Sequence, residues 1–208
     1  MKIICIGRNY ARHAKELNNP VPAKPVIFMK PPSALLVNGK PFYYPGFTKD
    51  LHHELEVVLK ICKNGKAVLP EFASSYYEEI TPGIDFTARD IQSELKKKGH
   101  PWEIAKGFDG SAVLGKFVPL EKVSQDGNIE FKLRKNGEVV QHGNTRDMIT
   151  SFDQLIVYVS QYFRLLQGDL IYTGTPAGVG PVQIGDKLEG FVTTVAGNEE
   201  QLLSCEVK

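Results

Sequence analysis

The segment LHHELEVVLKI, residues 51–61, alternates between apolar and polar side chains over most of its length. Apart from His53 its odd positions are apolar, and apart from Val58 its even positions are polar. A period of two is typical of a β-strand that turns one face toward a core. This stretch therefore predicts that the domain is built around a sheet, and Asn64-Gly65 after it predicts a hairpin turn.

Other segments on both sides of this strand also have the composition of strands. Residues 2–6 (KIICI) predict a short buried strand, and the chain from residue 113 onward is β-rich, with a hairpin turn at Asn136-Gly137. The proline-rich stretch 20–48 interleaves apolar residues with its prolines. We therefore expect it to hold short extended pieces and turns rather than a linker.

Helical patterns are few and short. We expect helices over 10–17, over 87–98 with Thr87 as the N-cap, and over 151–166 with Ser151 as the N-cap. No repeat, low-complexity tract or domain boundary interrupts the sequence. The prediction is a single α+β domain over residues 1–208, dominated by antiparallel and mixed sheet.

Composition argues against several classes of protein. Lys and Arg total 25 against 24 Asp and Glu, so the net charge is +1, which argues against a partner such as nucleic acid or an anionic membrane. The three cysteines are scattered singly, a pattern that suits a reducing compartment better than a disulfide framework or a zinc site. No apolar run approaches the roughly 18 residues of a membrane span, and MKIICIG is too short for a signal peptide. We therefore expect a cytoplasmic protein.

The polar positions of segment 51–61 include two acids, Glu54 and Glu56, whose carboxylates point to the same side of a strand. Such a pair repels unless a proton or a cation lies between them. A third acid, Asp85, precedes the predicted helix 87–98. Ligation by carboxylates alone suits Mg²⁺ or Mn²⁺ rather than zinc, so these three acids are candidate metal ligands. The alternative is a solvated strand face with two harmless acids.

Two further pairs have alternative interpretations. Asp85 and Arg89 are four residues apart, which suits a simple ion pair, or else Asp85 binds a metal while Arg89 faces an anionic substrate. His13 and Glu16 share a helix face, either as an exposed pair or as a base oriented by a carboxylate.

The glycine-rich segment TGTPAGVG, residues 173–180, follows the predicted strand DLIY. It lacks the Lys-Ser/Thr of a Walker A loop and the third glycine of a dinucleotide-binding fingerprint. Two interpretations remain open, a structural turn or a group of backbone donors for a carboxylate.

The sequence resembles the fumarylacetoacetate hydrolase family, in particular its small single-domain acylpyruvase members. The matching blocks follow the family's order over nearly the whole chain: GRNYARHAKE (7–16), FMKP (28–31), LHHELEVV (51–58), DFTARDIQ (85–92), AKGFDGSAVLG (105–115), GNTRDMI (143–149) and GDLIYTGTPAGVGP (168–181). The resemblance implies a mixed β-sandwich roll with short helices, assembled as a homodimer. One departure is Ala177, where close acylpyruvase relatives commonly have lysine, which leaves substrate preference open.

The same resemblance implies functional roles for residues of this chain. Mg²⁺ or Mn²⁺, one ion per subunit, would be held by the three acids named above, and the substrate would be a small 2-oxo acid. The substrate would be surrounded by Arg89, Gln92, Lys106 and Thr175. His13 and Glu16 would form a catalytic dyad on the segment 10–17, which would close over the site as a lid.

The implied activity is hydrolysis of a C–C bond in acylpyruvates. His13 would deprotonate a water that attacks the distal carbonyl, and Lys106 would neutralise or protonate the pyruvate enolate that leaves. Decarboxylation of oxaloacetate passes through the same enolate and is an expected side activity. The alternatives are a hydroxyhepta-diene-dioate isomerase or related hydratase, and a catalytically silent metal-binding or ligand-binding protein.

Overall fold

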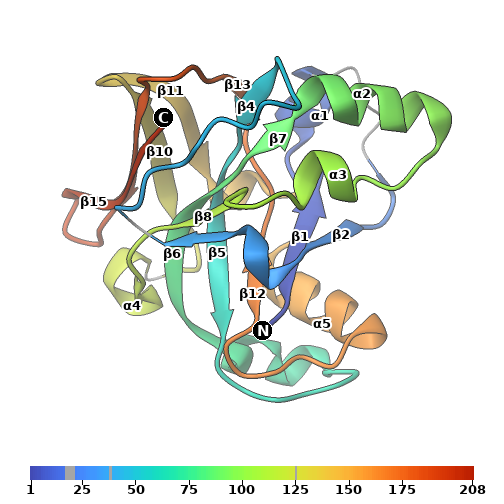
Figure 1. Cartoon of the computed structure of the whole chain (residues 1–208). Helices are drawn as coiled ribbons and strands as arrows, with labels where there is room; N and C mark the ends of the chain where they lie inside the picture. Colours follow the sequence, from blue (N-terminus) through green and yellow to red (C-terminus); the bar gives the residue numbers. More distant parts are fainter. Residues whose placement is uncertain (17–21, 38, 125) are drawn as a thin grey trace.

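The computed structural model describes residues 1–16, 22–37, 39–124 and 126–208, which form three sheets with short helices around them (Figure 1). The largest sheet has the order β2, β1, β12, β5, β6, β8, β3. An additional short strand, β9, pairs with β6. β1 is parallel to β12 and β3 to β8, whereas the other neighbours are antiparallel, so the sheet is mixed. Its strands are β1 (Ile3–Gly7), β2 (Val26–Lys30), β3 (Leu35–Val37), β5 (Leu55–Ile61), β6 (Tyr77–Asp85), β8 (Ala112–Leu114), β9 (Val118–Pro119) and β12 (Leu170–Tyr172).

The second sheet is antiparallel, in the order β11, β10, β14, β15, and a small third sheet has the order β13, β4, β7. The predicted turn Asn136-Gly137 joins β10 to β11, and both residues have positive φ (55° and 87°), as a two-residue hairpin of this type needs. The strands are β4 (Leu51–His53), β7 (Thr87–Ala88), β10 (Glu130–Lys135), β11 (Glu138–Asn144), β13 (Gly180–Pro181), β14 (Lys187–Thr193) and β15 (Glu199–Glu206).

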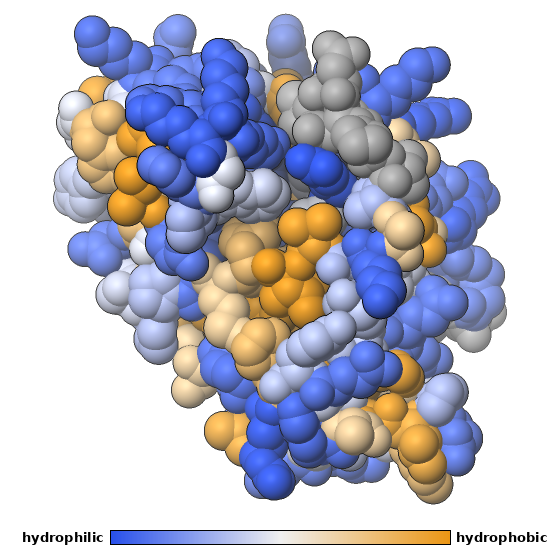
Figure 2. Space-filling model, turned by 90° about the vertical axis from the view of Figure 1, so that its right-hand side faces the viewer, coloured by the Kyte–Doolittle hydropathy of each residue, from blue (hydrophilic) through white to orange (hydrophobic). Residues whose placement is uncertain are grey.

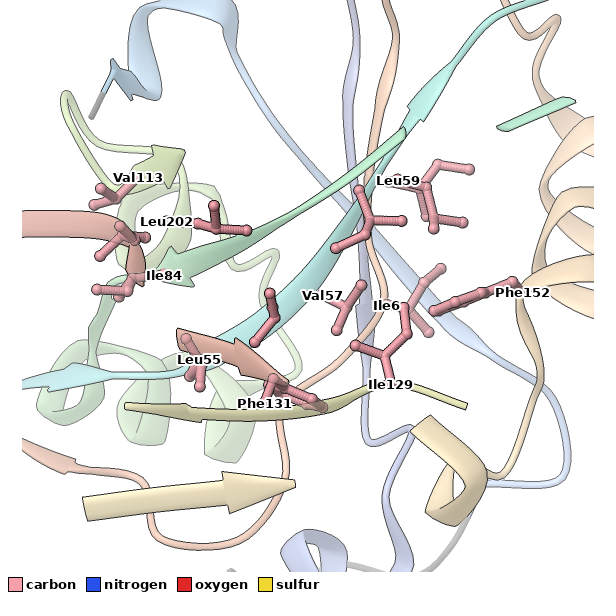
Figure 3. Close-up of a cluster of buried hydrophobic side chains, with 14 of the residues drawn as sticks. Ile6, Leu55, Val57, Leu59, Ile84, Val113, Ile129, Phe131, Phe152 and Leu202 are labelled. Carbon is pink, nitrogen blue, oxygen red and sulfur yellow. The ribbon is translucent and has the colours of Figure 1, made fainter. Parts of the chain in front are cut away.

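The main core lies between the large sheet and the second sheet. Figure 3 shows Leu55 and Val57 of β5 facing Phe131 of β10, with Ile6 and Phe152 at one end of the same cluster. These side chains are almost fully buried. Burying each of them contributes about 1.5–3 kcal/mol to the stability of the fold. The packed sheets agree with the predicted α+β roll.

The helices are short, as predicted, and lie at the edges of the sheets (Figure 1). α5 packs against the 3₁₀ helix η2, and Ser151 caps α5 with a reciprocal capping box to Gln154. The bounds are α1 (Ala11–Glu16), η1 (Pro32–Ala34), η2 (Pro70–Tyr76), α2 (Arg89–Lys98), α3 (Glu103–Lys106), α4 (Leu120–Val123), η3 (Thr145–Asp147) and α5 (Phe152–Tyr162). Position 17, the end of the predicted helix 10–17, is outside the described residues.

Three local predictions were wrong. The strand 51–61 is divided at Glu54 into β4 and β5, and β5 is buried on both faces because Val58 packs in a second apolar cluster. Asn64-Gly65 is not a hairpin turn, since β5 reaches β6 through η2. Thr87 does not cap α2, because it belongs to β7 and donates its hydroxyl to the Asp85 carbonyl (3.2 Å).

Hydrophilic side chains cover most of the face shown in Figure 2, and apolar side chains gather in a hollow near its middle. No helix among the described residues is long and apolar enough to cross a membrane.

Candidate active site

Three carboxylates meet where β5 and β6 pair. Glu54 lies in the break between β4 and β5, Glu56 is in β5, and Asp85 ends β6. The antiparallel register places Glu56 opposite Gly83, and the Asp85 amide donates to the Glu54 carbonyl (2.8 Å). One oxygen from each carboxylate lies within 4.8 Å of the others, and all three side chains are buried. The break in the strand therefore brings together the three acids that the sequence analysis selected.

Three buried cations surround these acids. Lys106, at the end of α3, donates to Glu54 Oε2 (2.8 Å) and to Asp85 Oδ2 (2.6 Å). Arg89 forms an ion pair with Glu54, and Lys30 Nζ lies 2.7 Å from Asp85 Oδ1. Because a buried charge is costly unless it is paired, each of these cations depends on the acids around it.

The pKa directions follow from this pairing. Burial alone would raise the pKa of Glu54, but the charges of Lys106 and Arg89 outweigh it and hold that pKa well below its usual range. Burial opposes the charge of Lys106, yet Asp85 and Glu54 raise the pKa of its ammonium group. Lys106 therefore carries a proton at neutral pH, so it places a positive charge and a hydrogen-bond donor beside the three acids.

Glu56 differs from the other two acids in its charged partners. It accepts a hydrogen bond from the Gly174 amide (2.7 Å), and within the described part of the chain no ion pair joins it to a cation. Burial, Asp85 and Glu54 all raise its pKa well above the usual range. A divalent cation would offset this excess of negative charge, and an all-oxygen donor set suits Mg²⁺ or Mn²⁺. The three acids therefore fit the predicted metal.

His13 and Glu16 of α1 are joined as predicted, with His13 Nδ1 3.2 Å from Glu16 Oε2. His13 is buried and lines the same cavity as the three acids. The other oxygen of Glu16 accepts from the Gly178 amide (3.0 Å). Backbone amides of the glycine-rich segment 173–180 thus donate hydrogen bonds to two carboxylates of the protein itself, Glu56 and Glu16. Of the two interpretations left open above, the segment therefore acts as a group of backbone donors for carboxylates.

The predicted substrate residues Arg89, Gln92 and Thr175 line this cavity too. Arg89 and Gln92 share one face of α2, where Arg89 Nη1 donates to Gln92 Oε1 (2.7 Å). The alternative of a simple Asp85–Arg89 ion pair was wrong, because Arg89 pairs with Glu54. Thr175 accepts from Gln141 Nε2 (2.8 Å).

Sequence reasoning missed two residues that hold this arrangement together. Lys30, the last residue of β2, is almost fully buried and also donates to Ser111 Oγ (2.9 Å). Gln141 accepts from His53 Nδ1 and the Leu55 amide (2.9 Å each), on either side of the break at Glu54. A lysine at the end of the apolar strand VIFMK is a usable signal, whereas a glutamine in a hairpin strand is not.

Comparisons with known proteins place the chain in a family. The model for the fumarylacetoacetate (FAA) hydrolase C-terminal family matches residues 2–202. The mitochondrial oxaloacetate tautomerase FAHD1 of Bos taurus is 44% identical over 190 residues, covering 91% of this chain and 86% of that protein. The mitochondrial oxaloacetate decarboxylase of Dictyostelium discoideum is 41% identical over 193 residues, covering 92% and 88%.

A solved structure gives the same result for the fold. The fumarylpyruvate hydrolase from Pseudomonas aeruginosa, in complex with Mn²⁺ and pyruvate, superposes with a TM-score of 0.89 at 35% identity. The match covers 100% of this chain and 89% of that one.

Proposed function

The chain belongs to the fumarylacetoacetate hydrolase family, and from this premise we propose that it is a divalent-metal-dependent enzyme that interconverts the keto and enol forms of oxaloacetate. Decarboxylation of oxaloacetate is the expected side activity, as in the Dictyostelium relative's name. The observation that carries the proposal is the cluster of Glu54, Glu56 and Asp85 with Lys106 bonded to two of its members. The proposed location is cytoplasmic, although the eukaryotic relatives are named as mitochondrial.

The three acids would hold Mg²⁺ or Mn²⁺, whose Lewis acidity favours negative charge on the 2-oxo oxygen of the substrate. Arg89 and Gln92 would bind the adjacent carboxylate, because a guanidinium group forms paired hydrogen bonds to a carboxylate. Lys106, which carries a proton, would deliver it to the enolate or neutralise the charge on that enolate. A positioned proton donor of this kind contributes roughly 10²–10⁴-fold to a rate.

Hydrolysis of acylpyruvates is the second candidate, and one observation favours it. His13 lies in the cavity and is held by Glu16, which is itself fixed by the Gly178 amide. That arrangement suits a base that deprotonates water, which tautomerisation does not need. The lid role proposed for residues 10–17 belongs with this second candidate.

The first experiment measures metal binding and turnover of Glu54→Ala. We expect loss of both, because removing Glu54 leaves Lys106 and Arg89 without their shared carboxylate and takes away a metal ligand. The assay follows the ultraviolet absorbance of enol-oxaloacetate with Mg²⁺ present. Normal turnover in a correctly folded Glu54→Ala protein would refute the proposed metal site.

The second experiment separates the two candidate reactions. His13→Ala should lose acylpyruvate hydrolysis, while metal affinity and oxaloacetate tautomerisation stay near the wild-type values. His100→Ala, which changes an exposed histidine outside the cavity, is the matched control. Undiminished hydrolysis of acetylpyruvate and fumarylpyruvate by His13→Ala would show that the dyad has no such role.

A further inference from the structure

Two cations at the outer part of the cavity differ from the three described above. Arg8 and Lys96 line the same cavity as the metal acids. Lys30, Lys106 and Arg89 are each paired with a carboxylate, but no ion pair joins Arg8 or Lys96 to an acid in the ranges that the structure describes. Unpaired positive charge beside a substrate cavity is a feature expected of an anion-binding site.

Arg8 has an uncommon backbone conformation and a buried donor. It follows the end of β1 and has a φ of 60°, a left-handed conformation that glycine and asparagine tolerate but that costs an arginine free energy. Its Nε is buried and has no hydrogen-bond partner among the residues that the structure describes. Arg8 also borders a second cavity of about 570 Å³, so it stands where the narrow metal site meets a larger space. An unpartnered buried donor at such a place calls for an acceptor from a ligand.

Two aromatic rings, Phe28 and Trp102, form a wall between Lys106 at the metal site and Lys96. Lys96 Nζ is 5.2 Å from the ring centre of Trp102, which packs on Phe28 (5.9 Å), and Lys106 Nζ is 5.0 Å from the ring centre of Phe28. Burial, followed by Arg89 and Arg8, lowers the pKa of Lys96 to about 8, while Glu54 opposes the shift. An anion between Lys96 and Arg8 would offset this repulsion.

We propose that Arg8 and Lys96 form a distal subsite that binds a second carboxylate, so that the enzyme selects 2-oxo dicarboxylic acids over monocarboxylic ones. This inference rests on the proposed function, which places the first carboxylate and the 2-oxo group beside Arg89 and the metal acids. The Phe28–Trp102 wall would contact the carbon chain between the two charged ends.

The simpler explanation of Lys96 is that it ends α2, where a cation suits the helix dipole. Lys97 is in the same last turn, is exposed, and does not line the cavity. It is therefore the matched control, because a dipole effect would be the same for both lysines whereas a ligand contact would not.

The test uses two non-cleaved ligands of equal chain length, 2-oxoglutarate and 2-oxopentanoate, which differ in the distal carboxylate. Isothermal titration calorimetry with Mg²⁺ measures the Kd of each for the wild type, Lys96→Met and Lys97→Met. We expect the wild type to prefer 2-oxoglutarate about tenfold or more, the size of one charge-assisted hydrogen bond. Lys96→Met should reduce that ratio toward one without changing the Kd of 2-oxopentanoate, and Lys97→Met should keep it.

Arg8→Asn provides the second variant, because asparagine tolerates positive φ and keeps the backbone in place. It too should lose the preference for 2-oxoglutarate. Equal affinity of the wild type for both ligands, or an unchanged ratio in Lys96→Met and Arg8→Asn, would overturn the distal subsite alone. If the wild type binds neither ligand, the proposed function fails, and the subsite fails with it.

Discussion

Lys106 determines how charge is divided among the three acids. Its ammonium group donates to Glu54 and Asp85 but to no oxygen of Glu56. Against the effect of burial, Lys106 and Arg89 lower the pKa of Glu54, whereas burial, Asp85 and Glu54 raise that of Glu56. Two carboxylates only two residues apart thus have opposite protonation preferences because of their surroundings rather than their type. Glu56 is therefore the acid whose charge depends most on a bound cation.

His53 gives a pH-dependent prediction. Burial lowers the pKa of this histidine to about 4, against an ordinary value of 6.5. The unfolded chain therefore binds a proton between those values that the native protein does not, so stability is complete above pH 6.5 and falls as the pH drops toward 4. The loss between pH 7 and pH 5 should be about 2 kcal/mol from this group. Urea unfolding in the presence of a chelator measures it.

The comparison that isolates His53 is His53→Gln, which keeps a donor for Gln141 but cannot titrate. Its unfolding free energy should fall less steeply between pH 7 and pH 5 than that of the wild type. Identical slopes for the two proteins would mean that His53 has the same pKa in the native and unfolded states.

At the scale of elements, the residues selected from the sequence do lie together in the fold, but the elements that carry them were predicted less well. The period-two pattern of 51–61 correctly indicated a strand and its acids, but it did not show the break at Glu54. That break depends on Gln141, a residue far along the chain that accepts hydrogen bonds on both sides of Glu54. Thr87 suited an N-cap locally, but pairing of β7 with β4 took precedence. Tertiary contacts of this kind leave no local signal.

Ser151 shows the opposite case, where local chemistry was sufficient. Its side chain accepts from the Gln154 amide, and the Gln154 side chain accepts from the Ser151 amide (2.9 Å), so Ser151→Ala removes one half of a capping box. We expect the variant to lose about 1 kcal/mol of stability in urea unfolding. Ser74→Ala, a change of an exposed serine outside a cap, should stay near the wild type. Equal stability of all three proteins would contradict the cap assignment.

For the whole molecule, the net charge of +1 is an average that does not reveal the cluster of buried acids and buried cations at the site. The site combines residues from β2, the β4–β5 break, β5, β6, α1, α2, α3 and the segment after β12, so only the complete fold assembles it. The balanced charge still predicts that nucleic acid and membranes are not partners, and the homodimer and the single domain over residues 1–208 also stay predictions. Sedimentation of the purified protein tests the dimer.

Metal binding should stabilise the whole fold, because the ligands come from β5, from β6 and from the break just before β5. An ion that binds only the native state at about 100 times its Kd adds roughly 2.7 kcal/mol, which for a chain of this size raises the Tm by roughly 5–10 °C. We expect this shift when Mg²⁺ or Mn²⁺ is added to chelator-treated protein in a thermal scan. Glu56→Gln keeps the shape of the side chain and its contact with Gly174 but loses the charge, so it should show a much smaller shift. A full shift in Glu56→Gln would mean that the ion binds elsewhere.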